Sequence, residues 1–439
     1  MNPLHRLWFG RGVLLSLVIG SLHPLDARAA ISPQGQAEGP IDGLRSDKPA
    51  VRRKTASDLG KSKRPEALPR LAELVRDPDV DVRLTVLRAI ASLRDLAGVP
   101  SMLVFMADPD VRPRSESIDG LVEIYTHRDR PRSSSFLSIF SADGRDKPEP
   151  LLVATVDFEV YRSLAARLKD SDAGVREKAA EAIGILGGTE VAVDLIAALG
   201  DSVSDVRAAA VTALVKAGTS ADGEALSPLV RDPSSAVRRR AISGLGRLKV
   251  GDAASVLRGL FEKSPESEEG ILALNSLAQI ALAQDRPLFQ RLAIQADPRR
   301  RRPAIEGLAR LGEKGHEDRF KRDFQREQNE ELRAAYAFAL FLFDDRPFID
   351  TVVLGLAGPR DRARQARGYV EELGARSLPE SLDYLREADP KIRAGLCDAL
   401  SNAGVVDALS AIEPLARDRD PQVAASAARA VAILKRQRR

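Results

Sequence analysis

A motif that recurs about every 31 residues limits the fold of this chain more than any other feature of its sequence. In GDSVSDVRAAAVTALVKAG (residues 200–218), an aspartate precedes a Val-Arg pair, and alanine and leucine follow at helical spacing. The anchor residue before the arginine, or its equivalent, falls at Val51, Val82, Val111, Val175, Val206, Val237, Leu332, Ala363, Ile392 and Val423, with weaker copies at residues 264–281 and 297–312. A register of this length is typical of helical solenoids and predicts about twelve units.

Each unit predicts two helices. Val206, Ala209, Ala210, Ala213 and Leu214 lie at offsets of 0, 3, 4, 7 and 8, which describe one face of an α-helix. Shorter apolar stretches, such as residues 191–200, 253–263 and 348–358, precede the motif and predict a second helix. Two antiparallel helices of this length cannot close a core alone, so each pair must stack on its neighbours.

The units resemble HEAT repeats, in particular the short repeats named for phycobilisome lyases. The stretches from Asp77-Pro78 to Val82-Arg83 and from Asp232-Pro233 to Val237-Arg238 carry this resemblance most closely, and it extends roughly over residues 45–435. The resemblance implies an all-α fold, a right-handed α-solenoid (superhelix) of about twelve antiparallel helix pairs with an extended concave face. Its Asp-Pro pairs suit the first turn of a helix.

The arginines that recur after the anchor residue have a structural role by the same resemblance, which implies a ladder between arginines and the aspartates of adjacent units. The ladder residues are Asp77, Arg83, Asp170, Arg176, Asp201, Arg207, Asp232, Arg238, Asp389 and Arg393. We therefore expect these arginines to hold the fold rather than a ligand.

The N-terminus has the three parts of a secretory signal. Arg6 and Arg11 precede an apolar run at residues 13–20, and Ala27 and Ala29 are spaced as a small-x-small cleavage site. The run is too short for a stable membrane anchor. We expect a signal peptide over residues 1–29, cleavage near Ala29, a flexible leader over 30–44, and a periplasmic or secreted protein without a membrane span. An uncleaved N-terminal anchor is the alternative.

Bulk composition gives little reason to expect a nucleic-acid partner. The formal charge is only +4 although 30% of residues are charged, and aromatic residues make up 4%. Balanced charge does not attract a polyanion, and few aromatic rings are available for base stacking. The single cysteine, Cys397, cannot form an internal disulfide.

Catalytic signatures are few. HEAT-like deoxyhypusine hydroxylases bind two irons through several His-Glu pairs, whereas here only His316-Glu317 forms such a pair. Bilin lyases, the other enzymes with these repeats, leave no residue signature that we recognise in this chain. Cys397 is expected on the apolar side of a helix, far along the chain from His127 and His316. We predict no enzyme, no catalytic residues, no metal and no cofactor.

Three features depart from the repeat. Residues 128–150 lack the motif and contain Phe136, Leu137, Ile139 and Phe140, which indicate either a decayed repeat or a protruding loop that binds a partner. Arg299, Arg300, Arg301 and Arg302 are adjacent, and we expect that they cannot all be paired internally, which leaves an acidic partner or a solvated corner. The basic tail at residues 434–439 suits a C-terminal cap.

Repeats without catalytic residues predict a non-catalytic protein-binding scaffold or adaptor in the bacterial cell envelope. The repeats fill residues 45–127 and 151–439, and the weak binding candidates are the apolar cluster and the four arginines. We expect a monomer whose partner is a protein. The alternatives are a lyase-like or hydroxylase-like enzyme or enzyme accessory, and a purely structural role through self-association.

Overall fold

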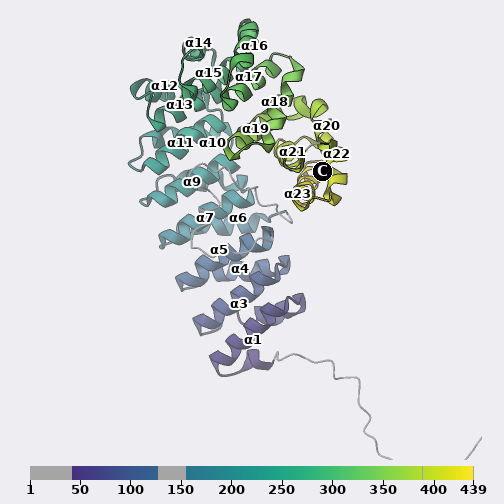
Figure 1. Cartoon of the computed structure of the whole chain (residues 1–439). Helices are drawn as coiled ribbons and strands as arrows, with labels where there is room; N and C mark the ends of the chain where they lie inside the picture. Colours follow the sequence, from purple (N-terminus) through teal and green to yellow (C-terminus); the bar gives the residue numbers. More distant parts are fainter. Residues whose placement is uncertain (1–41, 127–154, 388, 439) are drawn as a thin grey trace, which may run out of the picture. The chain divides into compact units, whose positions relative to one another are not determined.

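The chain folds into stacked helix pairs. The computed structural model describes residues 42–126, 155–387 and 389–438, and every regular element in these ranges is an α-helix or a short 3-10 helix (Figure 1). All described helices belong to one unit, residues 42–439. This confirms the all-α prediction of an α-solenoid. The signal, the leader up to residue 41 and the Phe136 to Phe140 cluster lie outside the described residues.

Twelve longer helices of the described chain, here called the B helices, follow one another along the array. Consecutive B helices pack side by side, from α1 on α3 to α21 on α23, and their row forms what we call the B face. They are α1 (Pro49–Ser62), α3 (Val80–Leu93), α5 (Val111–Thr126), α7 (Ala173–Leu186), α9 (Ser204–Ala217), α11 (Ser235–Arg247), α13 (Glu268–Ile280), α15 (Pro298–Arg310), α17 (Glu330–Leu342), α19 (Arg360–Leu373), α21 (Pro390–Asn402) and α23 (Pro421–Gln437).

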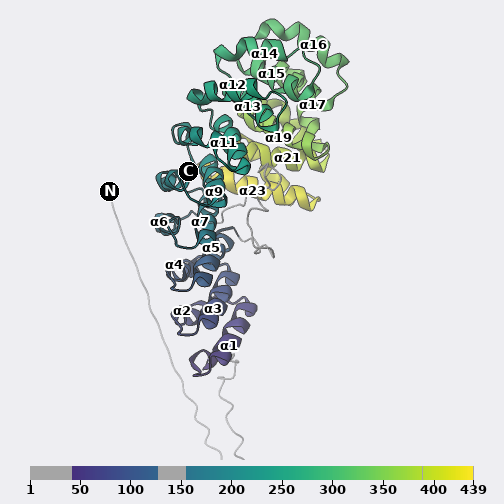
Figure 2. The same cartoon turned by 90° about the vertical axis from the view of Figure 1, so that its left-hand side faces the viewer.

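A shorter helical segment, here called an A helix, precedes each B helix and packs on it (Figure 2). Most A helices begin with a 3-10 turn, such as η3 (Leu96–Gly98) or η7 (Gly251–Ala253). The A segments are η1 (Asp42–Arg45), α2 (Leu68–Ala72), α4 (Val99–Met106), α6 (Phe158–Arg167), α8 (Ala192–Ala198), α10 (Ser220–Gly223) with η6 (Glu224–Arg231), α12 (Ala254–Lys263), α14 (Arg286–Leu292), α16 (Glu317–Arg326), α18 (Ile349–Leu354) with η11 (Gly355–Ala357), α20 (Leu378–Glu387), and α22 (Leu409–Ile412) with η14 (Glu413–Arg417).

The core lies between the A and B helices and between successive pairs. The apolar stripe of α9 is buried as its spacing predicted, since Val206, Ala209, Ala210, Ala213 and Leu214 are at most 1% exposed. Small residues bring the B helices close together. A Cβ atom at Gly184 of α7 would lie 2.8 Å from the Cα atom of Ala213, so a larger residue there would push α7 and α9 apart.

An arginine in the first turn of a B helix joins its own unit to the next one. Arg207 donates from Nε and Nη2 to Asp232, at 2.7 and 2.8 Å, and from Nη1 to the carbonyl of Asp201 at 2.9 Å. Asp232 also accepts the backbone N–H of Ser234. One guanidinium thus binds two interhelical loops, and its hydrogen bonds are the main reason that the pKa of Asp232 is lowered.

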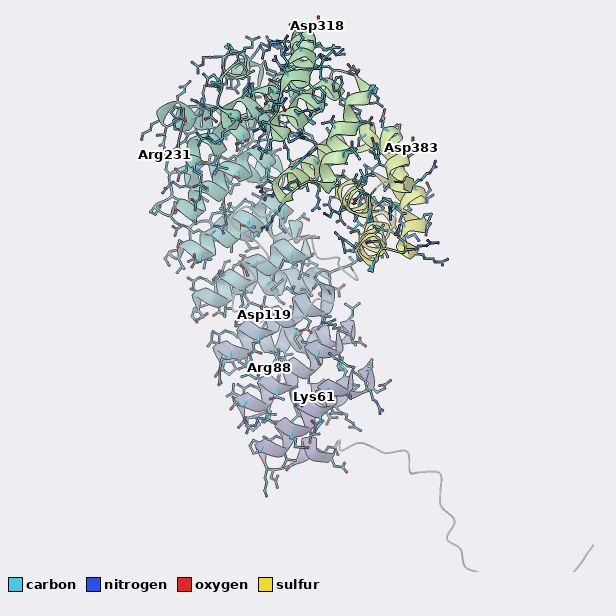
Figure 3. The ribbon with its side chains drawn as sticks, viewed as in Figure 1. Lys61, Arg88, Asp119, Arg231, Asp318 and Asp383 are labelled. Carbon is cyan, nitrogen blue, oxygen red and sulfur yellow. The ribbon has the colours of Figure 1, made fainter. Side chains whose placement is uncertain are left out.

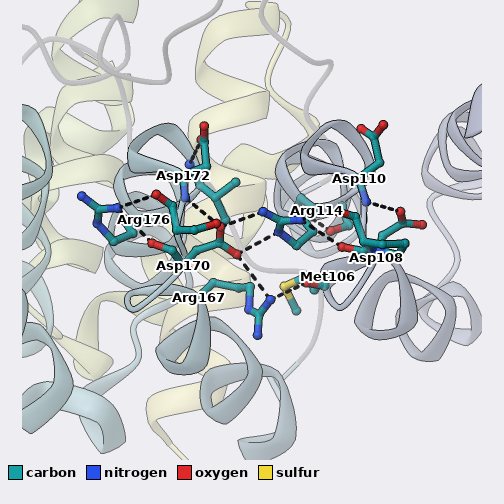
Figure 4. Close-up of polar contacts among 12 residues, drawn as sticks. Met106, Asp108, Asp110, Arg114, Arg167, Asp170, Asp172 and Arg176 are labelled. Atoms are coloured by element: carbon teal, nitrogen blue, oxygen red, sulfur yellow. Dashed lines mark hydrogen bonds and ion pairs between the residues drawn. The ribbon is translucent and has the colours of Figure 1, made fainter.

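The same two-pronged contact recurs along the array, and we call this set the arginine ladder. Figure 4 shows one example, in which Arg114 contacts Asp170 and the carbonyl of Asp108, beside Arg176 of the next unit, which contacts the carbonyl of Asp170. The pairs are Arg52–Asp77, Arg83–Asp108, Arg114–Asp170, Arg176–Asp201, Arg207–Asp232 and Arg393–Asp418.

Two of the ladder residues expected from the sequence have different contacts. Arg238 pairs with Glu269, in the first turn of α13, at 2.8 Å. Asp389 instead caps α21, where its side chain accepts the N–H of Lys391. The carboxylate that pairs with Arg393 is Asp418, at 3.1 Å.

The anchor assigned to Val111 was also wrong. Val111 is 38% exposed, whereas Pro113 is buried and the following Arg114 occupies the ladder position. Arg112 instead contacts Asp110 at the helix start. Pro113 follows Val82 by the usual period of 31 residues. The spacing therefore identifies the anchor of this unit better than the residue type does.

The segment without the motif does not separate the units on either side of it. Arg114 pairs with Asp170, α5 packs on α7, and α4 packs on α6, so these two units are neighbours in the stack. Residues 127–154 lie outside the described ranges, and the two interpretations of this segment, a decayed repeat or a protruding loop, stay predictions.

Removing one ladder arginine should loosen the array at that point. Arg207→Gln is expected to lower the local free energy of unfolding by about 3 kcal/mol, because it leaves the Asp232 carboxylate buried without its cation. Hydrogen exchange of the amides in α9 and α11 measures this. The matched control is Arg70→Gln, whose exposed pair with Glu73 should contribute less than about 1 kcal/mol. Equal effects of the two substitutions would contradict a structural role of the ladder.

Candidate functional site

The B face runs along the whole array of described B helices. Charged side chains lie along it, such as Arg88 on α3 and Asp119 on α5 (Figure 3). The ladder arginines cannot serve it as ligand groups, because each is largely buried in its contact with the next unit; the side chains of Arg83 and Arg207 are 11% and 12% exposed.

All four arginines of the run at the start of α15 have partners, contrary to expectation. Arg299 and Arg300 pair with Glu266, at 3.4 and 2.7 Å, and also with Asp297. Arg301 pairs with Glu327 at 2.6 Å, and Arg302 with Glu331 at 3.3 Å.

Successive residues of a helix point about 100° apart, so adjacent arginines reach different neighbouring segments. All four arginines of this run therefore form ion pairs within the chain. The run is no longer evidence for an acidic partner.

A polar cluster on the B face joins two units that are not consecutive. Tyr369 of α19 donates to Glu306 of α15 at 2.6 Å, and Arg310 of α15 donates to both carboxylate oxygens of Glu372 of α19 at 2.7 Å. We call these four residues the α15–α19 latch. The ring of Phe338, on the intervening α17, stacks on Tyr369 with the centroids 4.3 Å apart.

The latch spans the junction between α17 and α19. Of all consecutive B helices, α17 and α19 share the least extensive contact. Side chains two units apart can meet only if the B face curves inward at this point. The pKa of Tyr369 is well above its usual range, because the ring is buried and lies beside Glu306. The hydroxyl therefore stays protonated and donates a hydrogen bond to Glu306.

The latch was not recognised from the sequence. Glu306 and Arg310 belong to the weakened copy at residues 297–312, and Tyr369 and Glu372 lie after the anchor Ala363 at positions that the motif does not define. The signal that could have revealed it is the distance of two periods between Arg310 and Glu372.

Two carboxylates of α7 lack partners within the described chain. Glu181 is 5% exposed, its Oε1 atom is buried without a hydrogen bond, and Glu177 lies one helical turn earlier on the same face. Lys178 is held by Asp119 at 2.6 Å. Burial is the main reason that the pKa of Glu181 rises to about 8, with Glu177 and Asp119 adding to the effect and Lys178 and Arg240 opposing it.

The residues considered for chemistry remain isolated. His316 stacks on Phe320 with ring centroids 5.7 Å apart, and burial lowers its pKa. Cys397 is buried, and burial raises the pKa of its thiol to about 12. Among the described residues, no three or more His, Cys, Asp or Glu side chains gather closely enough to hold a metal ion. No helix in those ranges is long and apolar enough to cross a bilayer.

The latch should stabilise the α17–α19 junction. Glu372→Gln is expected to lower local stability by about 2 kcal/mol, since Arg310 is 10% exposed and would lose its two-pronged charged contact, keeping only the longer one to Glu306 at 3.4 Å. Hydrogen exchange of the α19 amides measures the loss. Arg376→Gln, which breaks an exposed pair with Asp344 just beyond α19, is the control and should change these amides little. Unchanged exchange in Glu372→Gln would contradict the assigned role.

Stability should depend on the ionisation of Glu181. The folded chain keeps this proton up to about pH 8, whereas the unfolded chain loses it near the ordinary value of 4.5, so stability falls as pH rises between these values. Glu181→Gln should unfold like the wild type at pH 4 but be about 2 kcal/mol more stable at pH 9. Urea unfolding across this range tests it, with Glu73→Gln, an exposed carboxylate, as control. Parallel pH profiles for wild type and Glu181→Gln would refute the assignment.

Comparison with known proteins places these helix pairs in a wider group. A profile of HEAT repeats matches residues 37–132, 156–215 and 223–309, more than half of the chain. A search of curated protein sequences gave no match.

Three solved structures illustrate the similarity. An engineered protein is 19% identical with a TM-score of 0.40, over 90% of this chain and 98% of that one. YibA of Escherichia coli is 18% identical with a TM-score of 0.41, over 62% and 91%. The complex of CpcE and CpcF of phycocyanin lyase from Nostoc sp. PCC7120 is 19% identical with a TM-score of 0.28, over 57% and 100%.

Proposed function

Because this chain belongs to the HEAT-repeat family, we propose that it is a non-catalytic scaffold that binds a protein partner along its B face. The observation that carries the proposal is the unbroken row of B helices, in which α5 packs on α7 despite the inserted segment. The ladder fixes the spacing of these helices, so their outward side chains keep a defined arrangement. A large preformed surface of this kind suits the binding of an extended segment or domain.

The proposed location is the bacterial cell envelope, in the periplasm or outside the cell. Its support is the sequence of residues 1–29, in which two arginines, an apolar run and the small residues Ala27 and Ala29 follow one another. Once the signal is removed near Ala29, the scaffold would meet partners of the same compartment. We infer a monomer, with no cofactor.

Photo-cross-linking in the source cells tests the proposed function. A benzophenone amino acid is placed at Thr212 of α9 or Ser243 of α11, which lie one and two periods after Glu181 on the B helices, or at Val193 on α8. Val193 is 78% exposed and serves as the A-helix control. We expect one protein to be cross-linked from the B helices and absent at Val193, and the recovered chain to begin near residue 30.

Cross-links only from Val193, or none above the level of a chain without the label, would contradict binding at the B face. Recovery of the chain with its first residues intact in the cytosol would contradict export. These two outcomes are independent, because the first concerns the surface and the second concerns the compartment.

A further inference from the structure

In the described part of the chain, two carboxylates on one turn of α7, Glu177 and Glu181, have no ion pair. Elsewhere the buried carboxylates of the ladder each face an arginine, as Asp232 faces Arg207. Glu177 and Glu181 of α7 differ, since no ion pair joins either of them to another residue in the described part of the chain. An unpaired carboxylate in a buried position is unfavourable unless something else supplies a donor.

None of the nearby cations forms an ion pair with Glu177 or Glu181 in the described part of the chain. Lys178 is bound by Asp119 of α5, and Arg176 is bound by Asp201 in the ladder. Arg240 of α11 donates to the carbonyl of Ala236 in its own helix at 3.2 Å, and its charge acts on the two carboxylates without a hydrogen bond.

The neighbouring helix α9 brings no cation to the corresponding positions, and its Asp205 adds a further negative charge that raises the pKa of Glu177. Ala208 and Thr212 of α9 stand one period after Glu177 and Glu181. The hydroxyl of Thr212 donates to the carbonyl of Ala208 within the helix, at 2.9 Å.

We propose that Glu177 and Glu181 form a subsite for the lysine or arginine side chain of a protein segment bound on the B face. This inference rests on the proposed function and adds to it the chemistry of the partner. An ammonium or guanidinium group carries several donors, so it can bind two carboxylates that lie one helical turn apart. Shielding from water strengthens such a contact relative to one on an open surface.

Binding at this subsite is coupled to a proton. In the free chain Glu181 holds its proton at neutral pH, because its pKa is raised to about 8. A bound cation favours the ionised carboxylate, so the proton leaves as the cation binds. Affinity therefore rises as the pH approaches 8. The other charged groups that act on Glu181 are Glu177 and Lys178 of its own helix, Asp119 of α5 and Arg240 of α11.

A titration with two matched peptides tests the subsite on the full chain. The probes are acetyl-Ala-Ala-Lys-Ala-Ala-amide and the same peptide with norleucine in place of lysine. The glutamate side-chain carboxyls carry ¹³C, and the resonances of Glu177 and Glu181 are assigned from Glu177→Gln and Glu181→Gln. At pH 7 we expect the lysine peptide to shift the Glu181 resonance towards its ionised position and to perturb that of Glu177, and the norleucine peptide to leave both unchanged.

The variants then give the affinity. Glu181→Gln should weaken binding of the lysine peptide at least tenfold, whereas Glu73→Gln, in the exposed pair with Arg70, should not. Thermal unfolding followed by circular dichroism shows that each variant is folded. Equal shifts with both peptides, or unchanged affinity in Glu181→Gln, would overturn the proposal.

Two other outcomes would also overturn it. If Mg²⁺ or Ca²⁺ shifts both carboxyls and the lysine peptide does not, the pair is a metal subsite. If Arg240→Gln moves the Glu181 resonance in the free chain from its ionised to its protonated position, Arg240 already supplies the cation.

The proposed function can fail separately from this inference. A partner that cross-links at the B face with equal yield in Glu177→Gln and Glu181→Gln would leave the scaffold function intact and remove the subsite. A response to the lysine peptide without any cross-linked partner would support the subsite and contradict the scaffold function. The two experiments therefore test different claims.

Discussion

The bidentate contact between a B-helix arginine and the aspartate of the following unit is the interaction on which the rest of the structure depends. In each contact, as for Arg207, two guanidinium nitrogens donate to the aspartate of the next loop and a third donates to a backbone carbonyl of the arginine's own loop. A hydrophobic stripe alone fixes neither the axial position nor the rotation of one pair on the next, since dispersion is not directional. The planar arginine fork supplies that direction.

This contact also explains how the array tolerates a long inserted segment. Arg114 contacts Asp170 with distances of 2.9 Å at both prongs, close to those of Arg207 and Asp232, although more chain separates its partners. The geometry of the junction is set by the two helix pairs that meet there, not by the length of chain between them. Loop length adds only slowly to the entropic cost of closure, so the ladder continues across the insertion.

How far the sequence predicted the structure depends on what the period could reveal. The buried face of α9 followed from spacing alone, because helical geometry converts offsets directly into directions. Asp389 was misassigned because an Asp-Pro pair suits both a ladder carboxylate and a helix cap. Arg238 follows Asp232 by six positions, whereas Arg393 follows Asp389 by only four. That shorter interval identifies the cap. The latch could not be predicted, since contacts between units two apart depend on local curvature.

The geometry of the ladder also decides which charged side chains are paired within the fold and which remain unpaired on the B face. A ladder arginine that is about one-tenth exposed is unavailable to a partner, and even the run at the start of α15 is neutralised by glutamates of adjacent segments. Charge that is satisfied internally adds little to recognition, because breaking such a pair to bind another group leaves a buried ion unpaired. Under the proposed function, the selectivity of the B face comes from the few charges that the fold leaves unmatched. Glu177 and Glu181 meet that condition, and α9 beside them carries only alanine and threonine at the corresponding positions.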